Sequence, residues 1–362
     1  MKKDFTKIFQ VAAVFIGTVV GAGLASGKEI TQFFTSFGLT SFLGILFCGV
    51  FYILMGSIIA KIGIKYSLNS YSDVLKIISP NLLGKITGVI TTFYLISSAS
   101  IILAGSGALI HQFFGAPKIV GSLIMLCIAC VFLLRDTEGL IEVNSFIVPA
   151  LLCTITLILV LYFLFCKDSI SLQYISSFEP PKKGVFVSTI LYAGYNILCC
   201  SGVLVPLSNE TKSSKTMVYG IALGALGLTL LSGSINLLLL ANQPYIFELE
   251  IPLLLVAQRF GSVIQALLLV IIWLEMFSTE VSDVYSISKT LEQSFNIKFK
   301  KGIFIVLAVA LPISQIGFSN LISTLYPLFG LLSLIFITQC IYFYYKHKSE
   351  LNYIVRYVEA RK

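Results

Sequence analysis

The chain has 362 residues, of which 57% are hydrophobic and 12% are charged, and its formal net charge is +8. This composition excludes a soluble globular protein, because no soluble core of this length needs so many long apolar runs. The positive charge does not indicate a nucleic-acid partner, since the basic residues lie in loops and at the ends of apolar runs, where membrane topology accounts for them. The sequence predicts a multi-spanning membrane protein.

The apolar runs predict ten membrane spans, most of them separated by Gly, Pro, Ser or Asn. The expected spans are 8–37, 40–60, 86–110, 119–134, 143–166, 184–206, 217–240, 262–288, 302–318 and 321–345. With the N-terminus in the cytoplasm, 19 of the 25 lysines and arginines fall in cytoplasmic segments and six fall outside. This bias predicts that both termini are cytoplasmic.

The first span contains four glycines within the eleven residues from Gly17 to Gly27. As one straight helix, residues 5–37 would be about 50 Å long, whereas a bilayer core is about 30 Å thick. Glycine weakens a helix interior, and unwound backbone inside a membrane must face protein or a wet cavity. We therefore expect a discontinuous helix with a binding site at its break. The alternative is an unbroken helix whose glycines pack closely on a neighbour.

The sixth span repeats this pattern, with Gly194, Asn196 and Gly202 inside an apolar run and Pro206 near its end. A glycine-interrupted span at the start of each five-span half is typical of inverted-repeat transporters. The sequence therefore predicts an all-α integral membrane fold of about ten helices in a five-plus-five inverted repeat, with helices 1 and 6 discontinuous. The single transmembrane domain covers 1–345, with a first repeat at 5–166, a second at 184–345 and a cytoplasmic tail at 346–362.

The eighth span carries most of the charge inside the apolar runs. Glu275, Ser278 and Thr279 lie along one helical stripe, and Asp283 lies at its edge. Carboxylates inside a membrane normally face the protein interior, where they mark ion or proton paths. The alternative is that Glu280 and Asp283 are hydrated at a cytoplasmic helix end. Glu29, which follows the glycines of the first span, is expected to face an outer vestibule.

The run VVGAGLASGKE at 19–29 resembles the YkvI-like family of bacterial permeases, and the resemblance covers nearly the whole chain. That family belongs to the amino acid–polyamine–organocation superfamily, which has the LeuT-type fold. The resemblance implies a permease in the bacterial cytoplasmic (inner) membrane.

The resemblance to sodium-coupled members of the superfamily also implies site residues. The implied sodium ligands are the backbone carbonyls of Gly17, Val20 and Glu275 and the hydroxyls of Ser278 and Thr279. All are oxygens, as a hard cation prefers. In the implied substrate site, a carboxylate would be held by the backbone amides of Ala22, Gly23 and Leu24. A substrate ammonium group would face the backbone carbonyls around Tyr192, Ala193, Gly194 and Tyr195, with the side chain of Asn196 nearby.

Departures from the superfamily patterns narrow this interpretation. Leu24 stands where sodium-dependent neurotransmitter-type members have an asparagine ligand, which argues against a second sodium site. No lysine lies between Ile141 and Phe165, where proton-coupled relatives often place one, and this favours sodium. The Asp-Pro-Gly-Asn motif of the metal-transporting branch is absent from the first span, which disfavours transition metals.

The resulting hypothesis is a secondary active transporter of a small zwitterionic or amine substrate, foremost an amino acid, by sodium symport with alternating access. One alternative is a proton-coupled carrier that uses Glu275 or Glu280, with Asp283 nearby. A second is a nutrient-sensing membrane receptor of the same fold. An enzyme is not expected, because the sequence shows no nucleophile–base pair or metal cluster. The expected partners are a small-molecule substrate and the lipid bilayer, with sodium as coupling ion, no other cofactor and no predicted oligomeric state.

Overall fold

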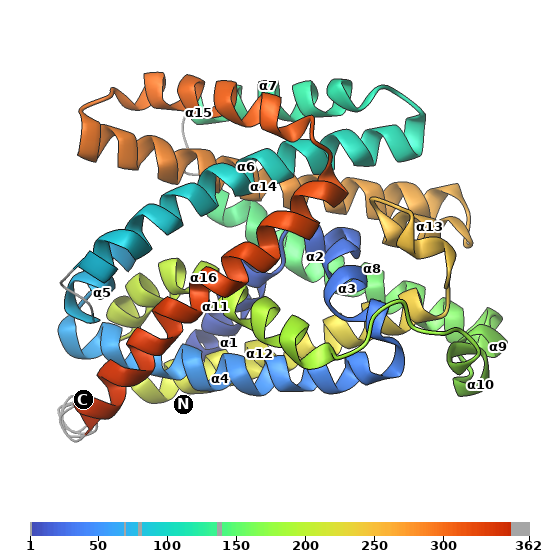
Figure 1. Cartoon of the computed structure of the whole chain (residues 1–362), viewed down its shortest axis with the longest axis horizontal. Coiled ribbons are helices and arrows are strands. Elements are labelled where there is room, and N and C mark those ends of the chain that lie inside the picture. Colours follow the sequence, from blue (N-terminus) through green and yellow to red (C-terminus); the bar gives the residue numbers. More distant parts are fainter. Residues whose placement is uncertain (1, 69, 79–81, 136–139, 349–362) are drawn as a thin grey trace.

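The computed structural model describes residues 2–68, 70–78, 82–135 and 140–348, and every regular element in these ranges is a helix (Figure 1). The elements are α1 (Lys2–Val19), α2 (Ala22–Ser26), α3 (Lys28–Phe33), η1 (Thr35–Thr40), α4 (Ser41–Tyr66), α5 (Tyr71–Ile78), α6 (Leu82–Phe114), α7 (Lys118–Arg135), α8 (Leu140–Phe165), α9 (Lys167–Ile170), α10 (Leu172–Ser176), α11 (Val185–Thr211), α12 (Ser214–Leu240), η2 (Tyr245–Phe247), α13 (Pro252–Gln258), α14 (Ser262–Phe295), α15 (Phe299–Ser314) and α16 (Phe318–Lys346).

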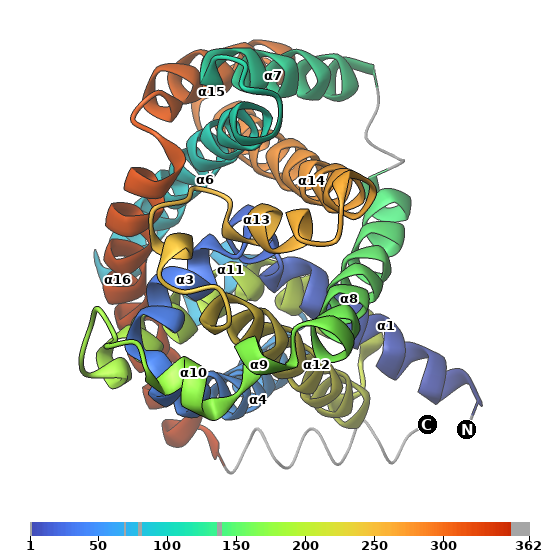
Figure 2. The same cartoon turned by 90° about the vertical axis from the view of Figure 1, so that its right-hand side faces the viewer.

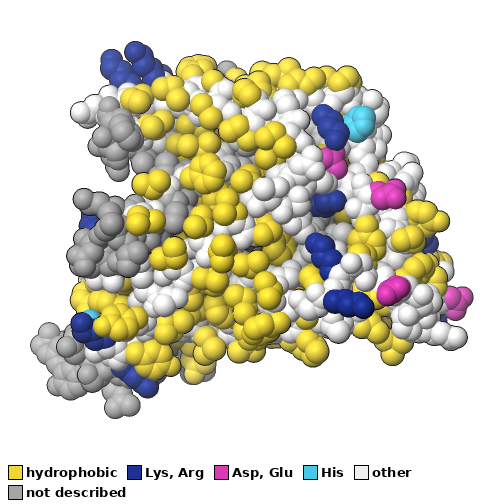
Figure 3. Space-filling view, in the orientation of Figure 1, with side chains coloured by type: hydrophobic (Ala, Val, Ile, Leu, Met, Phe, Trp, Pro, Cys, Tyr) yellow, Lys and Arg dark blue, Asp and Glu magenta, His cyan; other side chains and the backbone are white. Residues whose placement is uncertain are grey.

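Length and composition agree with a chain that crosses a membrane many times. In the described residues, 7 helices are long and apolar enough to span a bilayer, and the segments Phe5–Val19 and Lys118–Leu134 form shorter apolar helices. On the face seen in Figure 3, a broad hydrophobic band separates two ends where the charged side chains gather. Such a band between charged ends is the surface that a bilayer requires.

The long helices form two packed groups with two helices that join them. The group that we call the bundle consists of α1, α4, α11 and α12, and the group that we call the scaffold consists of α6, α7, α14 and α15 (Figure 1). Helix α16 packs along α11 and α6, whereas α8 contacts α14, α12 and α1. Each group therefore takes helices from both halves of the sequence. The predicted repeat boundaries at 5–166 and 184–345 remain a prediction, and residues 349–362 of the predicted tail lie outside the described residues.

The predicted break in the first span is confirmed. Helix α1 ends at Val19, Gly21 is extended (φ −118°, ψ −172°), and helical bonding resumes where the Ala25 amide donates to the Gly21 carbonyl (2.9 Å). A second turn follows at Gly27, whose φ of +81° separates α2 from α3. Glycine is needed there for this left-handed conformation and for space, because a Cβ would lie 2.8 Å from the Leu253 side chain.

The predicted break in the sixth span is wrong. Helix α11 runs without interruption from Val185 to Thr211. The Asn196 amide donates to the Tyr192 carbonyl one turn earlier (3.0 Å), so this polar side chain is satisfied inside the helix. Gly194 instead allows a close crossing with α16, where a Cβ would lie 2.5 Å from the Ser333 hydroxyl and 3.4 Å from the Gly330 carbonyl. The small-residue pattern here serves helix packing.

The boundary between the ninth and tenth spans also differs from the prediction. The helices separate at Gln315–Gly317, a few residues before the predicted join at Ser319 and Asn320. The reason is Gly317, whose φ of +102° ends the helical path.

Residues 241–258, which connect α12 to the residues before α14 and include α13, face the viewer in Figure 2. We call this segment the cap. Helix α13 contacts α2, α3, α12 and α14. The Gln112 amide of α6 donates to the Ile251 carbonyl (2.9 Å) and accepts from the Ile251 amide (3.1 Å). Lys118 of α7 forms an ion pair with Glu250. The cap is thus fastened to the scaffold over the broken first span.

Candidate substrate site at the break in the first helix

Glu29 lies inside the protein beside the helix break. The turn at Gly27 directs α3 so that the Glu29 side chain folds back toward α2, and the residue is only 2% exposed. Its carboxyl group rests against Gly23, where a Cβ would collide with it. The expectation that Glu29 faces an outer vestibule is therefore wrong. The carboxylate occupies the place beside Ala22–Leu24 that the sequence assigned to a substrate carboxylate.

Tyrosine hydroxyls surround this carboxylate. The Tyr192 hydroxyl of α11 donates to Glu29 Oε2 (3.2 Å), and Tyr326 of α16 interacts with the same carboxylate. The ring of Tyr195 stacks on that of Tyr326 at 4.4 Å between centroids. We call Glu29, Tyr192, Tyr195 and Tyr326 the carboxylate–tyrosine site. Hydroxyl donors stabilise a buried carboxylate in its charged form.

Further aromatic rings enclose the site. Phe33 and Phe34 pack on Tyr192 at 5.2 and 5.0 Å between centroids. On the other side, Tyr94 of α6 packs on Tyr195 at 5.8 Å and on Phe329 of α16 at 5.2 Å. Aromatic faces around a fixed negative charge form a suitable environment for an organic cation.

The neighbouring lysine does not neutralise Glu29. The Lys28 ammonium group is directed away toward the cap, where it donates to the Leu249 carbonyl (2.6 Å) and interacts electrostatically with Glu250. Glu29 is therefore a buried carboxyl group that a tyrosine hydroxyl holds in place. A buried carboxylate is costly without a positive partner, so a site of this kind favours a ligand that brings one.

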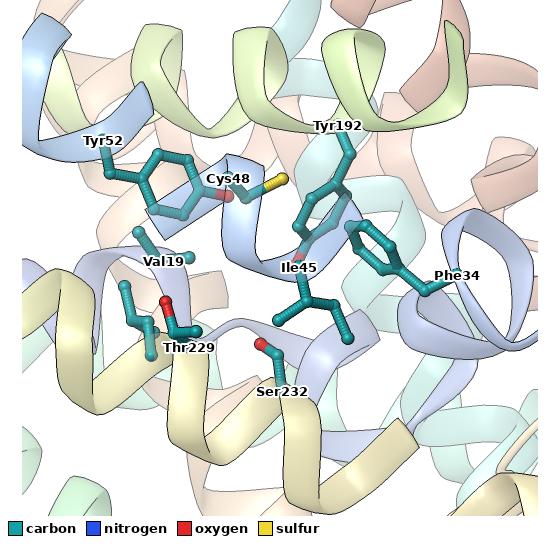
Figure 4. Close-up of a pocket in the computed structure, with 9 residues that line it drawn as sticks. Val19, Phe34, Ile45, Cys48, Tyr52, Tyr192, Thr229 and Ser232 are labelled. Carbon is teal, nitrogen blue, oxygen red and sulfur yellow. The ribbon is translucent and has the colours of Figure 1, made fainter. Parts of the chain in front are cut away.

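Two hollows lie next to the site. The larger, of about 420 Å³, opens between α3, α11 and α16, and its lining includes Phe33, Leu191 and Pro327, with the exposed Lys182 and Lys183 at its rim. The smaller, of about 10 Å³, lies between α1, α4, α11 and α12 (Figure 4). The Tyr192 ring points into it beside Phe34, and the Tyr52 hydroxyl there has no partner among the described residues. This space suits about one water molecule.

The structure brings some of the predicted substrate residues together. Ala22, Gly23 and Leu24 are buried at the start of α2, with the Glu29 carboxyl against Gly23. Tyr192 and Tyr195 reach the same place through their side chains. The predicted role for the carbonyls of Tyr192, Ala193, Gly194 and Tyr195 loses its basis, because α11 is unbroken and these groups lie in the helical ladder. Asn196 bonds its own helix. The sequence interpretation did not include Tyr326, which carries no motif.

The predicted sodium ligands come from α1, the break and α14. Gly17 lies in the last turn of α1 beside Val148 of α8, and Val20 lies at the break. Helix α14 packs against both α2 and α8. Ser278 is buried, and the Thr279 hydroxyl donates to the Glu275 carbonyl (3.0 Å). This assignment of a sodium site remains a prediction.

Helix α14 carries three buried carboxyl groups. Glu275, Glu280 and Asp283 are 3%, 0% and 8% exposed, so hydration of Glu280 and Asp283 at a helix end is wrong for this structure. Within the described ranges, Glu275 Oε2, both Glu280 carboxyl oxygens and Asp283 Oδ2 lack a hydrogen-bond partner. Such groups in a membrane helix are functional candidates.

Comparisons with known proteins identify the fold of the chain. No protein-family model matches it. The structure is similar to the inward-facing conformation of Mhp1 (TM-score 0.69, 15% identity, 92% of this chain and 76% of that one). It is also similar to a manganese transporter from Eremococcus coleocola (TM-score 0.63, 15% identity, 94% and 79%). Both neighbours have the LeuT-type fold, so the predicted fold is confirmed.

Two curated relatives from Bacillus subtilis (strain 168) align with most of the sequence. The uncharacterized protein YyaD is 26% identical over 333 residues, which cover 91% of this chain and 95% of YyaD. The uncharacterized membrane protein YkvI is 33% identical over 328 residues, which cover 91% of this chain and 93% of YkvI. With this identity along nearly the full length of both proteins, the chain belongs to the YkvI family of multi-pass membrane proteins.

Proposed function

We propose that this protein is a secondary active transporter of a small molecule that carries an ammonium group, such as an amine or an amino acid. The observation that carries the proposal is Glu29, a carboxylate buried beside the helix break and held by tyrosine hydroxyls. A substrate ammonium group would supply the missing positive charge, and the rings of Tyr195 and Tyr326 would add cation–π attraction.

The position of Glu29 also ranks the substrate classes. Its carboxyl group lies where the carboxylate of a zwitterion would meet Gly23. Two carboxylates at one place repel each other, so an amine fits this conformation better than the matching amino acid. An amino acid would fit only if Glu29 moved away from α2.

Binding to purified protein tests the substrate class. We would measure thermal stabilisation by tyramine and agmatine against tyrosine and arginine, which differ from these amines by one carboxylate. Stabilisation by an amine but not by its amino acid partner is expected. Glu29→Gln removes the charge and should weaken amine binding about tenfold or more, since a hydrogen bond to a charged group contributes about 1.5–3 kcal/mol. Stronger binding of the amino acids, unchanged in Glu29→Gln, would refute the amine assignment.

We further propose sodium as the coupling ion, held by the carbonyls of Gly17, Val20 and Glu275 and the hydroxyls of Ser278 and Thr279. The position of Val20 at the break and the packing of α14 against α2 support this site. Uptake into proteoliposomes should then require a sodium gradient, and the double variant Ser278→Ala/Thr279→Ala should lose that dependence. Sodium-driven uptake that persists in the double variant would show that the ion binds elsewhere.

Proton coupling is a second candidate, because buried carboxyl oxygens of Glu275, Glu280 and Asp283 lack partners in the described part of α14. Uptake that follows a pH gradient without sodium, and that Glu275→Gln or Glu280→Gln abolishes, would support it.

A nutrient-sensing receptor of this fold is the remaining alternative. It would bind a ligand and yet show no uptake into proteoliposomes.

A further inference from the structure

The larger hollow, between α3, α11 and α16, combines a basic rim with an apolar wall. Lys182 and Lys183 stand at the rim, and neither ammonium group has an ion-pair or hydrogen-bond partner among the described residues. The half-buried Gln32 of α3 adds an amide group to the same lining. Phe33 and Leu191 belong to the apolar wall. Positive and amide donors beside apolar side chains suit an amphipathic anion.

The hollow reaches from the end of a membrane span toward the middle of the bilayer. Lys182 and Lys183 directly precede α11, which is long and apolar enough to span a membrane. Leu191 is the seventh residue of α11, about 9 Å along the helix axis. Pro327 is the tenth residue of α16, about 14 Å along a helix that begins at the same end (Figure 1). One leaflet of a bilayer core is about 15 Å thick, so the hollow extends over the depth of a single leaflet.

The wall is open toward the lipid. Val187 of the wall is 65% exposed although it lies in a spanning helix, and Leu328, next to Pro327, is 40% exposed. In a bilayer, exposed side chains of this kind face acyl chains. Figure 3 shows basic side chains along the edge of the hydrophobic band. An occupant can therefore enter the hollow from the surrounding membrane.

Hydrogen bonds hold the rim and the wall in place. The Lys182 backbone amide donates to the Ser36 carbonyl of η1 (2.9 Å). Deeper in the hollow, the Ser188 hydroxyl of α11 donates to the Phe33 carbonyl of α3 (2.9 Å). Both bonds join the first span to the chain around the start of α11. A site that is already formed loses less conformational freedom when it binds a ligand.

We propose that this hollow binds one anionic phospholipid of the surrounding bilayer. Lys182, Lys183 and Gln32 hold the phosphate, and an acyl chain lies along Val187 and Leu191. The two ammonium groups offset the charge of the phosphate. They repel the ammonium group of a zwitterionic headgroup, which disfavours phosphatidylcholine. They repel a soluble amine as well, so the hollow is distinct from the proposed substrate site, and the lipid site does not depend on which substrate is transported.

The occupied hollow borders the carboxylate–tyrosine site. Phe33 lines the hollow and packs on Tyr192 at 5.2 Å between ring centroids, and Pro327 directly follows Tyr326 in α16. An acyl chain fills the space behind these residues and binds only the folded state, so it should stabilise the protein against unfolding. The phosphate also offsets the charge of the rim lysines, which stays uncompensated where anionic lipid is absent.

Lipid titrations of delipidated protein in a neutral detergent test the site. The probes are palmitoyl-oleoyl phosphatidylglycerol and palmitoyl-oleoyl phosphatidylcholine, which share their acyl chains and differ in headgroup charge. Phosphatidylglycerol should raise the melting temperature, and remain bound in native mass spectra, at concentrations about tenfold below those that phosphatidylcholine needs. Inorganic phosphate should have no effect at these concentrations, because it lacks the apolar half. Equal stabilisation by the two lipids, or stabilisation by phosphate alone, would overturn the proposal.

Three variants separate the hollow from general surface charge. Lys182→Gln/Lys183→Gln should weaken phosphatidylglycerol binding about tenfold or more. Lys300→Gln/Lys301→Gln removes the same charge from another exposed pair, in the first turn of α15, and should bind as the wild type does. Val187→Trp narrows the hollow with both rim lysines retained, and it should lose the preference for phosphatidylglycerol. Equal weakening in the two lysine-pair variants, or wild-type binding by Val187→Trp, would show attraction to surface charge alone and refute the site.

Discussion

Glu29 and Gly23 are in close contact, so the position of the Glu29 side chain requires glycine at position 23. The carboxyl group of Glu29 takes up the volume that a side chain at position 23 would need. Glycine at 23 therefore keeps the carboxylate beside the helix break, between α2 and the hydroxyls of Tyr192 and Tyr326. The Glu29 carboxyl group can take this position because residue 23 has no Cβ atom.

The pair yields a prediction with a matched control. In Gly23→Ala the new methyl group should displace the Glu29 carboxylate and weaken binding of tyramine or agmatine about tenfold or more. Gly21→Ala, two residues earlier, adds the same methyl group where nothing lies within 4 Å, and it should bind as the wild type does. Thermal-shift titration of both variants measures this. Equal affinities in the two variants would contradict the proposed position of the charge.

Lys182 and Lys183 affect the site from a distance. They stand exposed at the rim of the 420 Å³ hollow and should repel an approaching cation. The variant Lys182→Glu/Lys183→Glu should therefore raise the initial rate of amine uptake several-fold at low ionic strength. High salt should remove the difference, because exposed charges are screened. A rate gain that persists in high salt would point to a structural effect.

Among the elements, the crossing of α11 and α16 depends on Gly194 and Gly330. A Cβ at position 330 would collide with the Leu191 carbonyl, which belongs to backbone and cannot rotate away. Gly330→Ala should therefore destabilise the protein by about 1–3 kcal/mol through overpacking. Gly233→Ala in α12 meets open space and should be neutral or slightly stabilising, because alanine favours helix. Melting temperatures in detergent compare the two, and equal shifts would contradict the close crossing.

The sequence could not distinguish the two uses of glycine in the first and sixth spans. Both spans carry small residues in an apolar run, and the same pattern suits an unwound segment and a close helix crossing. In the first span the extended Gly21 and the left-handed Gly27 break the helix. In the sixth span, Gly194 packs against Gly330 of α16, which lies more than a hundred residues later in the chain. The sequence around Gly194 does not indicate this partner.

At the scale of the whole molecule, apolar periodicity was sufficient to predict an all-helical membrane fold and most helix positions, and the resemblance to the YkvI-like family implied the LeuT-type fold. The direction of Glu29 was not predictable, because it depends on the dihedral angles of one glycine, Gly27. The contribution of Tyr326 was equally hidden, since it comes from the tenth span and carries no motif. The sequence thus located the break, and tertiary packing determined which side chains fill it.

The orientation of the molecule follows from its charges and can be measured. The concentration of lysine and arginine in the expected cytoplasmic segments predicts that both termini are cytoplasmic, and therefore that the cap is external. A reporter enzyme that is active only outside the cytoplasm should be inactive when fused after Lys348 and active when inserted near Lys182. The reverse pattern would contradict the predicted orientation.

The unequal anchoring of the cap has a consequence for how readily the α13 end opens. Gln112 and Lys118 tie the cap to α6 and α7, whereas Lys28 ties it to α3, which packs on α11 and α12. If the bundle moves against the scaffold, the Lys28 bond to Leu249 must break, together with the contacts that α13 makes with α3 and α12. Such a bond is worth about 1.5–3 kcal/mol, enough to shift a resting equilibrium by about tenfold or more. Lys28, which lies outside the proposed ligand contacts, therefore contributes to how often the α13 end opens, and a substitution at this position can change that frequency without changing the ligand contacts.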